Sequence, residues 1–420
     1  MSAEPPKAYL VCVGSELLSG QVNTHQAWLS VRLRRAGFDV IGESSLPDSV
    51  PRIRAALKRA LAAADAVIVC GGLGPTFDDI TREAAASALG RKLSFRPRLW
   101  KVILKRFARY HVAVPEENKR QAEVIDGAEV LPNASGSAPG QRLEFRAGGR
   151  ARSLILLPGP YSEMSPIFDA VLPRLAARHA RGAAAALTVR LAGVPESVAD
   201  ERLDPVRARH PGASFTILAS GGEVSFHATA RARTAAAARR EIAEIREEVL
   251  AAVGRWSVGE GDETLEGALG ARLRKAGLTL CVAESCTGGL LGARLTSVAG
   301  SSAWFNGGVI AYANGVKTRA LGVKPSLLAR HGAVSKECAL AMAEGARKFA
   351  ASSMAISITG IAGPGGGTKA KPVGTVHVAV SGPGRAASAR ALLIHGPREQ
   401  VRSRAASAAL VLLKETLDAL

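Results

Sequence analysis

Residues 65–72 have the sequence DAVIVCGG and decide the fold class of the first part of the chain. Five apolar residues follow an aspartate and end at two glycines, with no polar residue between them. Such a run is typical of a strand covered on both faces, as the strands of parallel sheets are. Outward from it, strand-like runs alternate with amphipathic helical segments, namely AYLVCVG, HQAWLSVRLRRAG, FDVIGES and SVPRIRAALKRALAAA. This alternation predicts an α/β layered domain over residues 1–165, with parallel strands joined by crossover helices.

Two further domains are expected after this one. Residues 166–257 contain a strand, a helix, a hairpin and a long helix, which is the pattern of a small α+β module. Its element order is KH-like, but it lacks the GxxG loop that clamps a nucleic-acid backbone, so we expect a structural or dimerising spacer. After the polar linker VGEGDE, residues 264–420 alternate again and contain the strand candidates LTLCVAE, GGVIAYA, MAISITG and TVHVAV. These residues are expected to form an independent α/β domain.

Composition limits the class of protein. The chain has 420 residues, 47% hydrophobic and 22% charged, which favours a folded multidomain protein over a disordered one. No apolar run approaches the roughly 18 residues that span a bilayer, and the first residues lack the pattern of a secretory signal. We therefore expect a cytoplasmic protein without a membrane partner. The five cysteines include no CxxC pair, so neither a disulfide framework nor a zinc site is expected.

The net charge of +19 indicates anionic ligands or simply an arginine-rich composition. The densest basic segment, residues 91–120, reads as the solvated face of an amphipathic helix. No aromatic residues interleave on that face to stack bases, so a nucleic-acid partner is not expected.

The stretch AESCTGG, residues 283–289, offers three neighbouring nucleophiles, Ser285, Cys286 and Thr287. It lies between an expected strand and an expected helix. The amides of Thr287, Gly288 and Gly289 would then lie near a helix start and could form an oxyanion hole. The alternative is a structural turn in which Thr287 caps the helix.

A serine nucleophile needs a base, and the residues alone leave several candidates. Tyr312 and Lys317 lie in AYANGVK, and His331 and His377 are equally eligible. A buried lysine can act as a base because burial lowers its pKa.

Two further features of the third domain could bind substrate. Thr359 and Gly360 begin the glycine-rich loop TGIAGPGGG, which either approaches a phosphate closely or is a plain turn. Arg398 and Arg402 on the last helical stretch are candidates for a phosphate clamp, the alternative being surface charge.

The first domain has its own candidate loop, residues 70–79, with the sequence CGGLGPTFDD. A glycine-rich loop that follows a parallel strand and opens a helix offers N–H groups to an anion. The adjacent carboxylates of Asp78 and Asp79 could hold a divalent cation that bridges phosphate oxygens. Alternatively, Thr76 or Asp78 caps the helix and the glycines only shape the turn. The expected pocket residues are Glu16, Asn23, Gly72, Gly74, Thr76 and Asn118.

The order of several long motifs resembles the CinA family, competence/damage-inducible protein A, over essentially the whole chain. GSELLSGQVNT, GGLGPTFDDIT, ENKRQA, NASGSAPG and LPGPYSEM are similar to the amino-terminal part of that family. AESCTGG, GSSAWFNGGVIAYANGVK, HGAVS, TGIAGPGGG and KPVGTVHVAV are similar to its carboxyl-terminal part. The resemblance implies a three-layer molybdopterin-binding-like domain, a KH-like spacer and a deamidase domain.

The resemblance also implies activities. The carboxyl-terminal domain would hydrolyse nicotinamide mononucleotide to nicotinate mononucleotide and ammonia without a cofactor. Ser285 would be the nucleophile, Tyr312 and Lys317 the activating pair, and Cys286 a packing residue. The protein is expected to be a homo-oligomer, and we expect it to be a dimer.

The amino-terminal domain would hydrolyse ADP-ribose with a divalent metal ion at Asp78 and Asp79. One departure concerns this domain, because His25 stands where the family motif NTN has its second asparagine. The alternative to an enzyme is a non-catalytic molybdopterin-like or nucleic-acid-associated competence protein.

Overall fold

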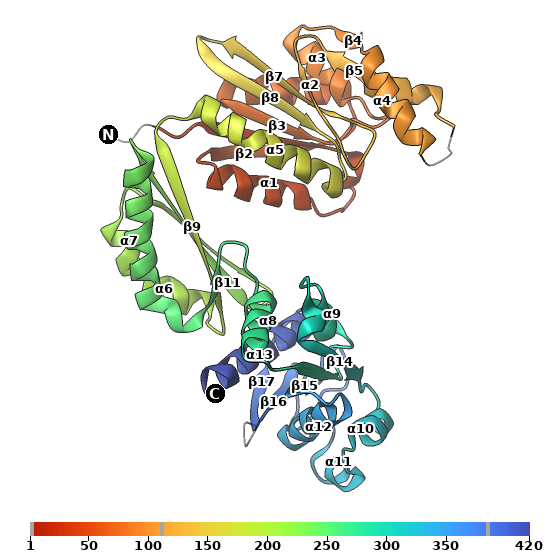
Figure 1. Ribbon diagram of the computed structural model, residues 1–420, viewed down its shortest axis with the longest axis vertical. Coiled ribbons are helices and arrows are strands. Elements are labelled where there is room, and N and C mark those ends of the chain that lie inside the picture. Colours follow the sequence, from red (N-terminus) through yellow and green to blue (C-terminus); the bar gives the residue numbers. More distant parts are fainter. Residues whose placement is uncertain (1–3, 110–112, 384–386) are drawn as a thin grey trace. The chain divides into compact units, whose positions relative to one another are not determined.

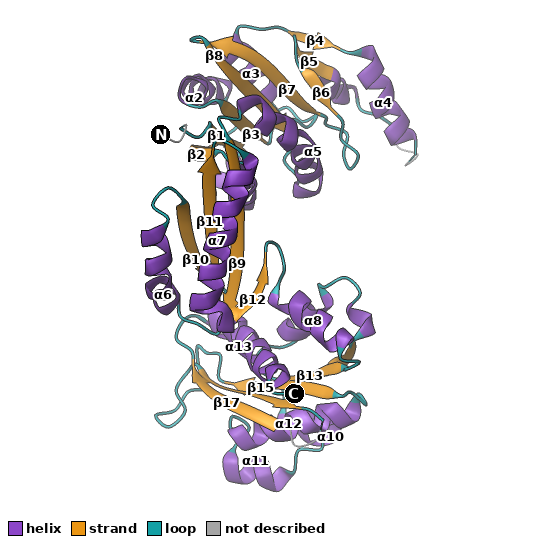
Figure 2. Cartoon of the chain, turned by 60° about the vertical axis from the view of Figure 1, so that its left-hand side comes forward, coloured by secondary structure: helices purple, strands orange, loops and turns teal. Residues whose placement is uncertain are grey.

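The computed structural model describes residues 4–109, 113–383 and 387–420, and the chain divides into two compact units (Figures 1 and 2). Unit 1 comprises residues 1–186 and 229–242, and unit 2 comprises residues 187–228 and 243–420. The division runs through strands β9 (Ala183–Ala192) and β11 (Glu223–Ala232) and through helix α7 (Ala235–Val253).

Unit 1 is built on a six-stranded sheet with the order β2-β1-β3-β8-β7-β6. Four neighbouring strands pair in parallel: β2 (Asp39–Leu46), β1 (Lys7–Val13), β3 (Ala66–Cys70) and β8 (Arg150–Leu157). Strands β7 (Gly140–Ala147) and β6 (Glu129–Leu131) extend the sheet in the antiparallel direction. All five residues of β3 are buried, which confirms the expectation of a strand covered on both faces.

Helices cover both faces of this sheet. Apolar side chains of α1 (Thr24–Arg35) and α5 (Tyr161–His179) pack on one face, and those of α2 (Val50–Ala63) and α3 (Thr81–Leu89) pack on the other. The smaller elements of unit 1 are η1 (Ser15–Leu18), β4 (Leu93–Phe95), α4 (Pro97–Ala108), η2 (Glu116–Ala122) and β5 (Glu123–Ile125). The three-layer α/β architecture expected for this part of the chain is confirmed.

The domain end expected at residue 165 falls inside α5. Ile167, Phe168, Val171 and Leu175 of this helix are buried in the same core as strands β1 and β3. The layer therefore continues through His179, because the apolar stripe of one helix cannot be divided between two cores.

The middle part of the chain forms a four-stranded sheet with the order β10-β11-β9-β12. Its other elements are α6 (Glu196–Arg209), β10 (Ser214–Ser220), η3 (Gly254–Trp256) and β12 (Ser257–Glu260). Strand β12 occupies the first half of the stretch expected to be a linker, since its backbone pairs with β9 from Ser257 to Glu260. Polar side chains do not prevent an edge strand when its backbone finds a partner.

The carboxyl-terminal part of unit 2 is a five-stranded sheet with the order β14-β13-β15-β16-β17. Strands β14 (Phe305–Ile310), β13 (Leu280–Glu284) and β15 (Met354–Gly360) are parallel, and β16 (Thr375–Ser381) and β17 (Ala387–Leu393) are antiparallel. Helices α8 (Leu265–Lys275), α9 (Leu290–Thr296) and α13 (Arg398–Asp418) share one core with the sheet. Helices α10 (Asn314–Leu321) and α12 (Lys336–Phe349) share the core on the opposite face, where α11 (Pro325–His331) also packs. A short η4 (Ser301–Ala303) precedes β14.

This topology brings distant loops together. The carboxyl ends of neighbouring parallel strands meet at one edge of a sheet, so the segments that follow β13, β14 and β15 lie side by side. These segments contain Ser285, Tyr312 and the loop after Gly360.

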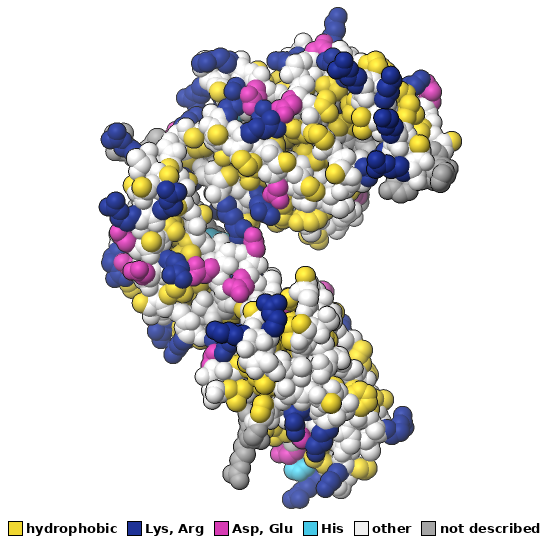
Figure 3. Space-filling view, in the orientation of Figure 1, with side chains coloured by type: hydrophobic (Ala, Val, Ile, Leu, Met, Phe, Trp, Pro, Cys, Tyr) yellow, Lys and Arg dark blue, Asp and Glu magenta, His cyan; other side chains and the backbone are white. Residues whose placement is uncertain are grey.

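Basic side chains are spread over the surface shown in Figure 3. Of the residues of α4, only Ile103 is buried, and Arg98, Lys101 and Lys105 are exposed. The segment therefore has the solvated basic face that its amphipathic pattern indicates. In the described part of the chain, no helix combines the length and the apolar character needed to cross a membrane.

Candidate active site

Ser285 and Lys317 form a buried pair at the carboxyl end of β13. Ser285 directly follows the strand and is 8% exposed, and Lys317, on α10, is 1% exposed. The Lys317 Nζ lies 3.0 Å from Ser285 Oγ, 2.7 Å from the Ala311 carbonyl and 3.1 Å from the Tyr312 carbonyl. Burial lowers the pKa of Lys317 below its usual value. The amine is thus held against the hydroxyl in surroundings that favour its neutral form.

The three partners of Lys317 fix the direction of its lone pair. The two carbonyls can only accept hydrogen bonds, whereas the Ser285 hydroxyl can also donate one. A neutral amine has two N–H donors, which suit the two carbonyls, and one lone pair, which then faces the Ser285 hydroxyl. This arrangement can remove a proton from the serine.

Glu284 organises the loop that carries the serine. It is 1% exposed, and its carboxylate accepts hydrogen bonds from the amides of Gly289, Leu291 and Gly292, at 3.0, 3.1 and 2.8 Å. A carboxylate at a helix start satisfies donors that the helix leaves free and complements its dipole. Glu284 therefore acts as the cap of α9, although it lies on the preceding strand.

The occupied amides correct two expectations about this turn. The Gly289 amide donates to Glu284 and the Gly288 amide donates to the Ser285 carbonyl at 3.1 Å, so neither is free to form an oxyanion hole. The alternative, with Thr287 as the capping residue, is also wrong, because the N-cap of α9 is Gly289 and no side chain at that position caps it. Among the described residues, no group accepts a hydrogen bond from the Thr287 amide, and its buried hydroxyl has no partner.

Cys286 points into the core of the carboxyl-terminal domain. It is 6% exposed, and burial raises the pKa of its thiol to about 11. A thiol that stays protonated near neutral pH is a poor nucleophile, so the geometry favours Ser285 over its neighbour.

Arg398 and Arg402 tie together the three loops at this edge of the sheet. Arg398 donates to the Tyr312 hydroxyl at 3.1 Å and to the Gly363 carbonyl at 2.7 Å, and Arg402 donates to the Thr287 carbonyl at 2.6 Å. The two arginines are four residues apart, so they lie on the same side of α13. Each guanidinium keeps donors beyond those that these contacts use.

Tyr312 does not take the position expected for a residue that activates Ser285 together with Lys317. Tyr312 is 59% exposed, its hydroxyl accepts a hydrogen bond from Arg398, and its carbonyl accepts one from Lys317. The structure therefore does not bring the Tyr312 hydroxyl into hydrogen-bond contact with Ser285 or Lys317.

The other candidates of this domain lie away from the pair or have their groups engaged. Thr359 is 1% exposed and its hydroxyl donates to the Ala333 carbonyl at 2.8 Å. Gly360 lies against β16, where a side chain would come within 2.8 Å of the Thr375 carbonyl. His331 lies 3.7 Å from Glu337, and His377 is on β16, so neither histidine is hydrogen-bonded to Ser285.

The amino-terminal loop at residues 70–79 is held by its own side chains. Asp79 accepts hydrogen bonds from the amide and the hydroxyl of Thr76. A side chain at Gly74 would overlap the Asp79 carboxylate, so this glycine makes room for the turn. Arg120 donates to the Thr76 and Asp79 carbonyls at 2.7 and 3.1 Å. Helix α3 begins at Thr81 with Ile80 as its N-cap, so neither Thr76 nor Asp78 caps it.

A cavity of about 390 Å³ lies beside this loop, and only some of the expected pocket residues line it. Glu16, Asn23 and His25 line it together with Gly71. Asn23 also has a structural role, since its side chain accepts from the Gln26 amide at 3.2 Å and caps α1. The remaining expected members do not line this cavity: Gly72, Gly74, Thr76, Asn118, Asp78 and Asp79.

Two of these residues are engaged within the fold. Gly72 packs against Thr81, and buried Asn118 donates to Gln121 at 3.1 Å. His25 stacks on Tyr161 with ring centroids 6.3 Å apart, and burial lowers its pKa.

Two carboxylates of this loop could supply part of the ligand set of a bound cation. Among the residues that the structure describes, no three His, Cys, Asp or Glu side chains cluster as a metal site. Asp78 is exposed, and Asp79 has one oxygen engaged by Thr76. Two carboxylates suit a Mg²⁺-like ion that also binds phosphate oxygens and water.

Sequence reasoning missed three organising residues, Glu284, Arg82 and Arg120. Arg82 is 1% exposed and donates to the Leu73 and Gly74 carbonyls at 2.5 and 3.1 Å. A signal existed for Glu284, because an acidic residue shortly before a glycine-rich helix start is a common cap. No local pattern distinguishes the two arginines from surface ones.

Comparisons with known proteins agree with this organisation. Family models match three successive segments: "Probable molybdopterin binding domain" at residues 9–177, "Damage-inducible protein CinA KH domain" at 187–259 and "CinA C-terminal domain" at 262–417. A CinA-like protein of Solibacter usitatus is 40% identical and the match covers 98% of each chain. A CinA-like protein of Anaeromyxobacter dehalogenans is 43% identical over 97% of this chain and 99% of its own. The crystal structure of competence/damage inducible protein CihA from Agrobacterium tumefaciens is 37% identical over 37% of this chain and 96% of that chain, with a TM-score of 0.35.

Proposed function

Because the chain belongs to the CinA family, we propose that its carboxyl-terminal domain is an amidohydrolase that converts nicotinamide mononucleotide to nicotinate mononucleotide and ammonia. The observation that carries this proposal is the 3.0 Å contact between the buried Lys317 Nζ and Ser285 Oγ. A serine activated by a neutral lysine is suited to attack a carboxamide. The choice of substrate rests on the resemblance to the family's deamidase motifs.

In the first half of the proposed reaction, Ser285 Oγ attacks the carboxamide carbon while Lys317 takes the hydroxyl proton. Lys317 then gives this proton to the departing nitrogen, and ammonia leaves from a nicotinoyl ester on Ser285. In the second half, water attacks the ester and Lys317 again transfers the proton, which restores the serine and releases the acid. The Ala311 and Tyr312 carbonyls keep the amine in place during both transfers.

Developing negative charge on the carbonyl oxygen needs donors near Ser285. We assign this role to the amide and the hydroxyl of Thr287, since no described group accepts from either. Losing one such donor typically reduces the rate by about 10²- to 10³-fold.

Arg398 and Arg402 are assigned to the phosphate of the substrate. They lie at the edge of the sheet where the three loops meet, and a guanidinium suits phosphate because it offers paired donors. The half-exposed Tyr312 ring lies between this end and the amine, because its hydroxyl contacts Arg398 and its carbonyl contacts Lys317.

Ammonia release by the full-length chain tests the proposal. We expect turnover of nicotinamide mononucleotide by the wild-type protein and a loss of at least about 10³-fold in Ser285→Ala. Full ammonia release by Ser285→Ala would overturn the mechanism. DNA binding without turnover of the nucleotide would instead favour the non-catalytic competence protein.

A second activity, hydrolysis of the ADP-ribose pyrophosphate, is proposed for the amino-terminal domain. The cavity lined by Glu16, Asn23 and His25 favours it, because the cavity opens at the carboxyl ends of β1 and β3, where α/β sheets bind ligands. Asp78 and Asp79 would hold a divalent cation, which would neutralise phosphate charge. Metal-dependent release of AMP from ADP-ribose that is lost in Asp78→Asn with Asp79→Asn would support this activity, and metal-independent release would contradict it.

A further inference from the structure

The tip of the β10–β11 hairpin, residues 219–224, packs on helix α13 within unit 2. The Ser407 hydroxyl of α13 donates to the Gly221 carbonyl at 2.7 Å. Gly222 has a φ of +90°, and a side chain there would come within 3.3 Å of Ser407 Cβ. Both the backbone conformation and the close approach favour glycine at this position.

Arg294 lies at the centre of this contact. Its guanidinium donates to Glu223 at 2.9 Å, to the Ser407 hydroxyl at 2.7 Å and to Glu266. The side chains of Arg294 and Glu223 are each 20% exposed, and that of Glu266 is 10% exposed. The arginine on α9 therefore joins three other elements, the hairpin strand β11, helix α8 and helix α13. A largely buried group of this kind has defined geometry, because an unpaired charge there would be costly.

Two of the joined helices carry the candidate active site. Helix α9 follows directly from the Ser285 loop and is capped by Glu284. Helix α13 presents Arg402 only five residues before Ser407, within one continuous helix. A shift of α13 at Ser407 would therefore displace the arginines that reach Thr287 and Tyr312.

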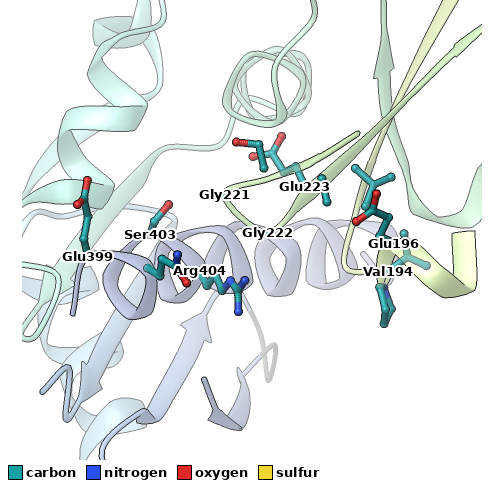
Figure 4. Close-up of a pocket in the computed structure, with 13 residues that line it drawn as sticks. Val194, Glu196, Gly221, Gly222, Glu223, Glu399, Ser403 and Arg404 are labelled. Atoms are coloured by element: carbon teal, nitrogen blue, oxygen red, sulfur yellow. The ribbon is translucent and has the colours of Figure 1, made fainter. Parts of the chain in front are cut away.

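A cavity of about 850 Å³ flanks the hairpin tip. Figure 4 shows Gly221, Gly222 and Glu223 of the tip close to the helix that bears Glu399, Ser403 and Arg404. Glu196 lines another part of the same cavity and is exposed. Beside this open space, hydrogen bonds of Arg294 and Ser407 join the tip to α13.

We propose that the hairpin tip of the middle domain positions the arginine-bearing start of α13 through Glu223, Arg294 and Ser407, and so sets the affinity of the deamidase site for the phosphate of its substrate. The middle domain is then a part of the deamidase and not only a spacer. Glu223, Arg294 and Ser407 are positioning residues, since none of them is assigned a contact with substrate. The proposal rests on the proposed function of the carboxyl-terminal domain.

The test compares Glu223→Gln with Glu196→Gln in the full-length chain. Both variants exchange one carboxylate for an amide in the same cavity, but only Glu223 contacts Arg294. We expect Glu223→Gln to raise KM for nicotinamide mononucleotide about three- to tenfold with kcat changed less than about twofold. Turnover of nicotinamide riboside, which lacks the phosphate, should change less than about twofold. Glu196→Gln should behave like the wild type.

A measurement without substrate separates this proposal from the proposed function. Hydrogen–deuterium exchange at the start of α13, residues 398–407, should be faster in Glu223→Gln than in Glu196→Gln. Ser407→Ala, which keeps a good helix former, should give the same kinetic and exchange changes if Glu223→Gln does not fold. Equal KM and equal exchange in all variants would overturn the proposal, as would an equal loss of kcat on both substrates. Absence of turnover in the wild type, with faster exchange in Glu223→Gln, would overturn only the proposed function.

Discussion

The loop at residues 284–289 and the loop at residues 70–79 lie at the ends of buried parallel strands and contain similar residues, yet different groups lie against them. Both are glycine-rich, and in both a carboxylate accepts a hydrogen bond from one amide of its own loop, Glu284 from Gly289 and Asp79 from Thr76. In the first loop this leaves Ser285 facing a buried amine. In the second, Arg120 and Thr76 occupy polar groups of the turn, and the Cys70 thiol, 3.9 Å from His25 Nδ1, has a pKa raised by burial. A glycine-rich loop after a strand therefore indicates a place for a site, whereas the groups buried behind the loop decide what it can do.

Among the substitutions that test this difference between the two loops, Lys317→Met should have the largest effect on ammonia release. It removes the proposed base but keeps an unbranched side chain of similar length. Ammonia release should fall by about 10²- to 10⁴-fold, the usual contribution of a general base. In the wild type, kcat/KM should rise with pH and level off above the lowered pKa of Lys317, because only the neutral amine accepts the serine proton. Rates measured from pH 6 to 10 check both points. A Lys317→Met variant with the wild-type rate and pH profile would show that the two loops do not differ in this way.

Glu284→Gln should have the next largest effect. An amide cannot accept from three N–H groups as the carboxylate does, and its own NH₂ would face one of them. Hydrogen bonds to a charged group contribute about 1.5–3 kcal/mol, so we expect the free energy of unfolding to fall by about 2 kcal/mol. We expect kcat to fall about tenfold because the Ser285 loop loses its anchor.

The matched substitution in the other loop is Asp79→Asn. It should leave ammonia release unchanged within about twofold, since Asp79 belongs to unit 1 and the Ser285 loop to unit 2. Thermal unfolding and ammonia release measured on both variants make the comparison. Equal effects of the two substitutions on ammonia release would contradict the separate roles of the two loops.

Arg402→Gln should have a smaller effect on the same reaction. It removes the charge that we propose binds the substrate phosphate, and it weakens the 2.6 Å contact with the Thr287 carbonyl. We expect KM for nicotinamide mononucleotide to rise about tenfold, which corresponds to about 1.4 kcal/mol of binding. Steady-state kinetics check this, with Arg404→Gln on the same helix as a control that should leave KM unchanged.

Cys286→Ala should have the smallest effect. The thiol packs in the core and carries no assigned role, so kcat should stay within about twofold of the wild-type value. Removing a buried sulfur should lower the free energy of unfolding by about 1 kcal/mol. A large loss of activity in a stably folded Cys286→Ala variant would reopen the choice of nucleophile.

Much of the fold follows from local sequence. Strand β3 is an uninterrupted apolar run and β13 is apolar up to its last residue, Glu284, and both are found as expected because burial on two faces favours apolar residues. Strand β17 was not predicted, since ASARALL pairs at the edge of the sheet and only part of it is covered. Boundaries were less predictable for a related reason. Helix α5 crosses the expected domain end because its apolar stripe packs on strands β1 and β3, which lie much earlier in the sequence.

The choice of Ser285 and Lys317 came from the resemblance to the family, since the residues alone left several bases open. The two side chains meet because β13 and β14 are parallel neighbours, which the sequence alone does not show. The occupied amide of Gly289 could not be foreseen, since it depends on where the Glu284 side chain turns, and that of Gly288 depends on how the backbone turns after Ser285. The network of Arg294 joins residues more than 100 positions apart, which no local pattern reveals. Oligomeric state, cellular location and the metal ion stay predictions.

In the proposed reaction, the carboxylate of Glu284 would also orient the nucleotide. A helix start is the usual place for a substrate phosphate, but the start of α9 already holds an anion that belongs to the protein. A second negative charge at that point would be repelled, so the phosphate of a bound nucleotide would be directed toward the arginines of α13. The uncharged carboxamide would then be the end that enters beside Ser285. The site therefore has a negative charge at the start of α9 and positive charges on α13 before any substrate binds.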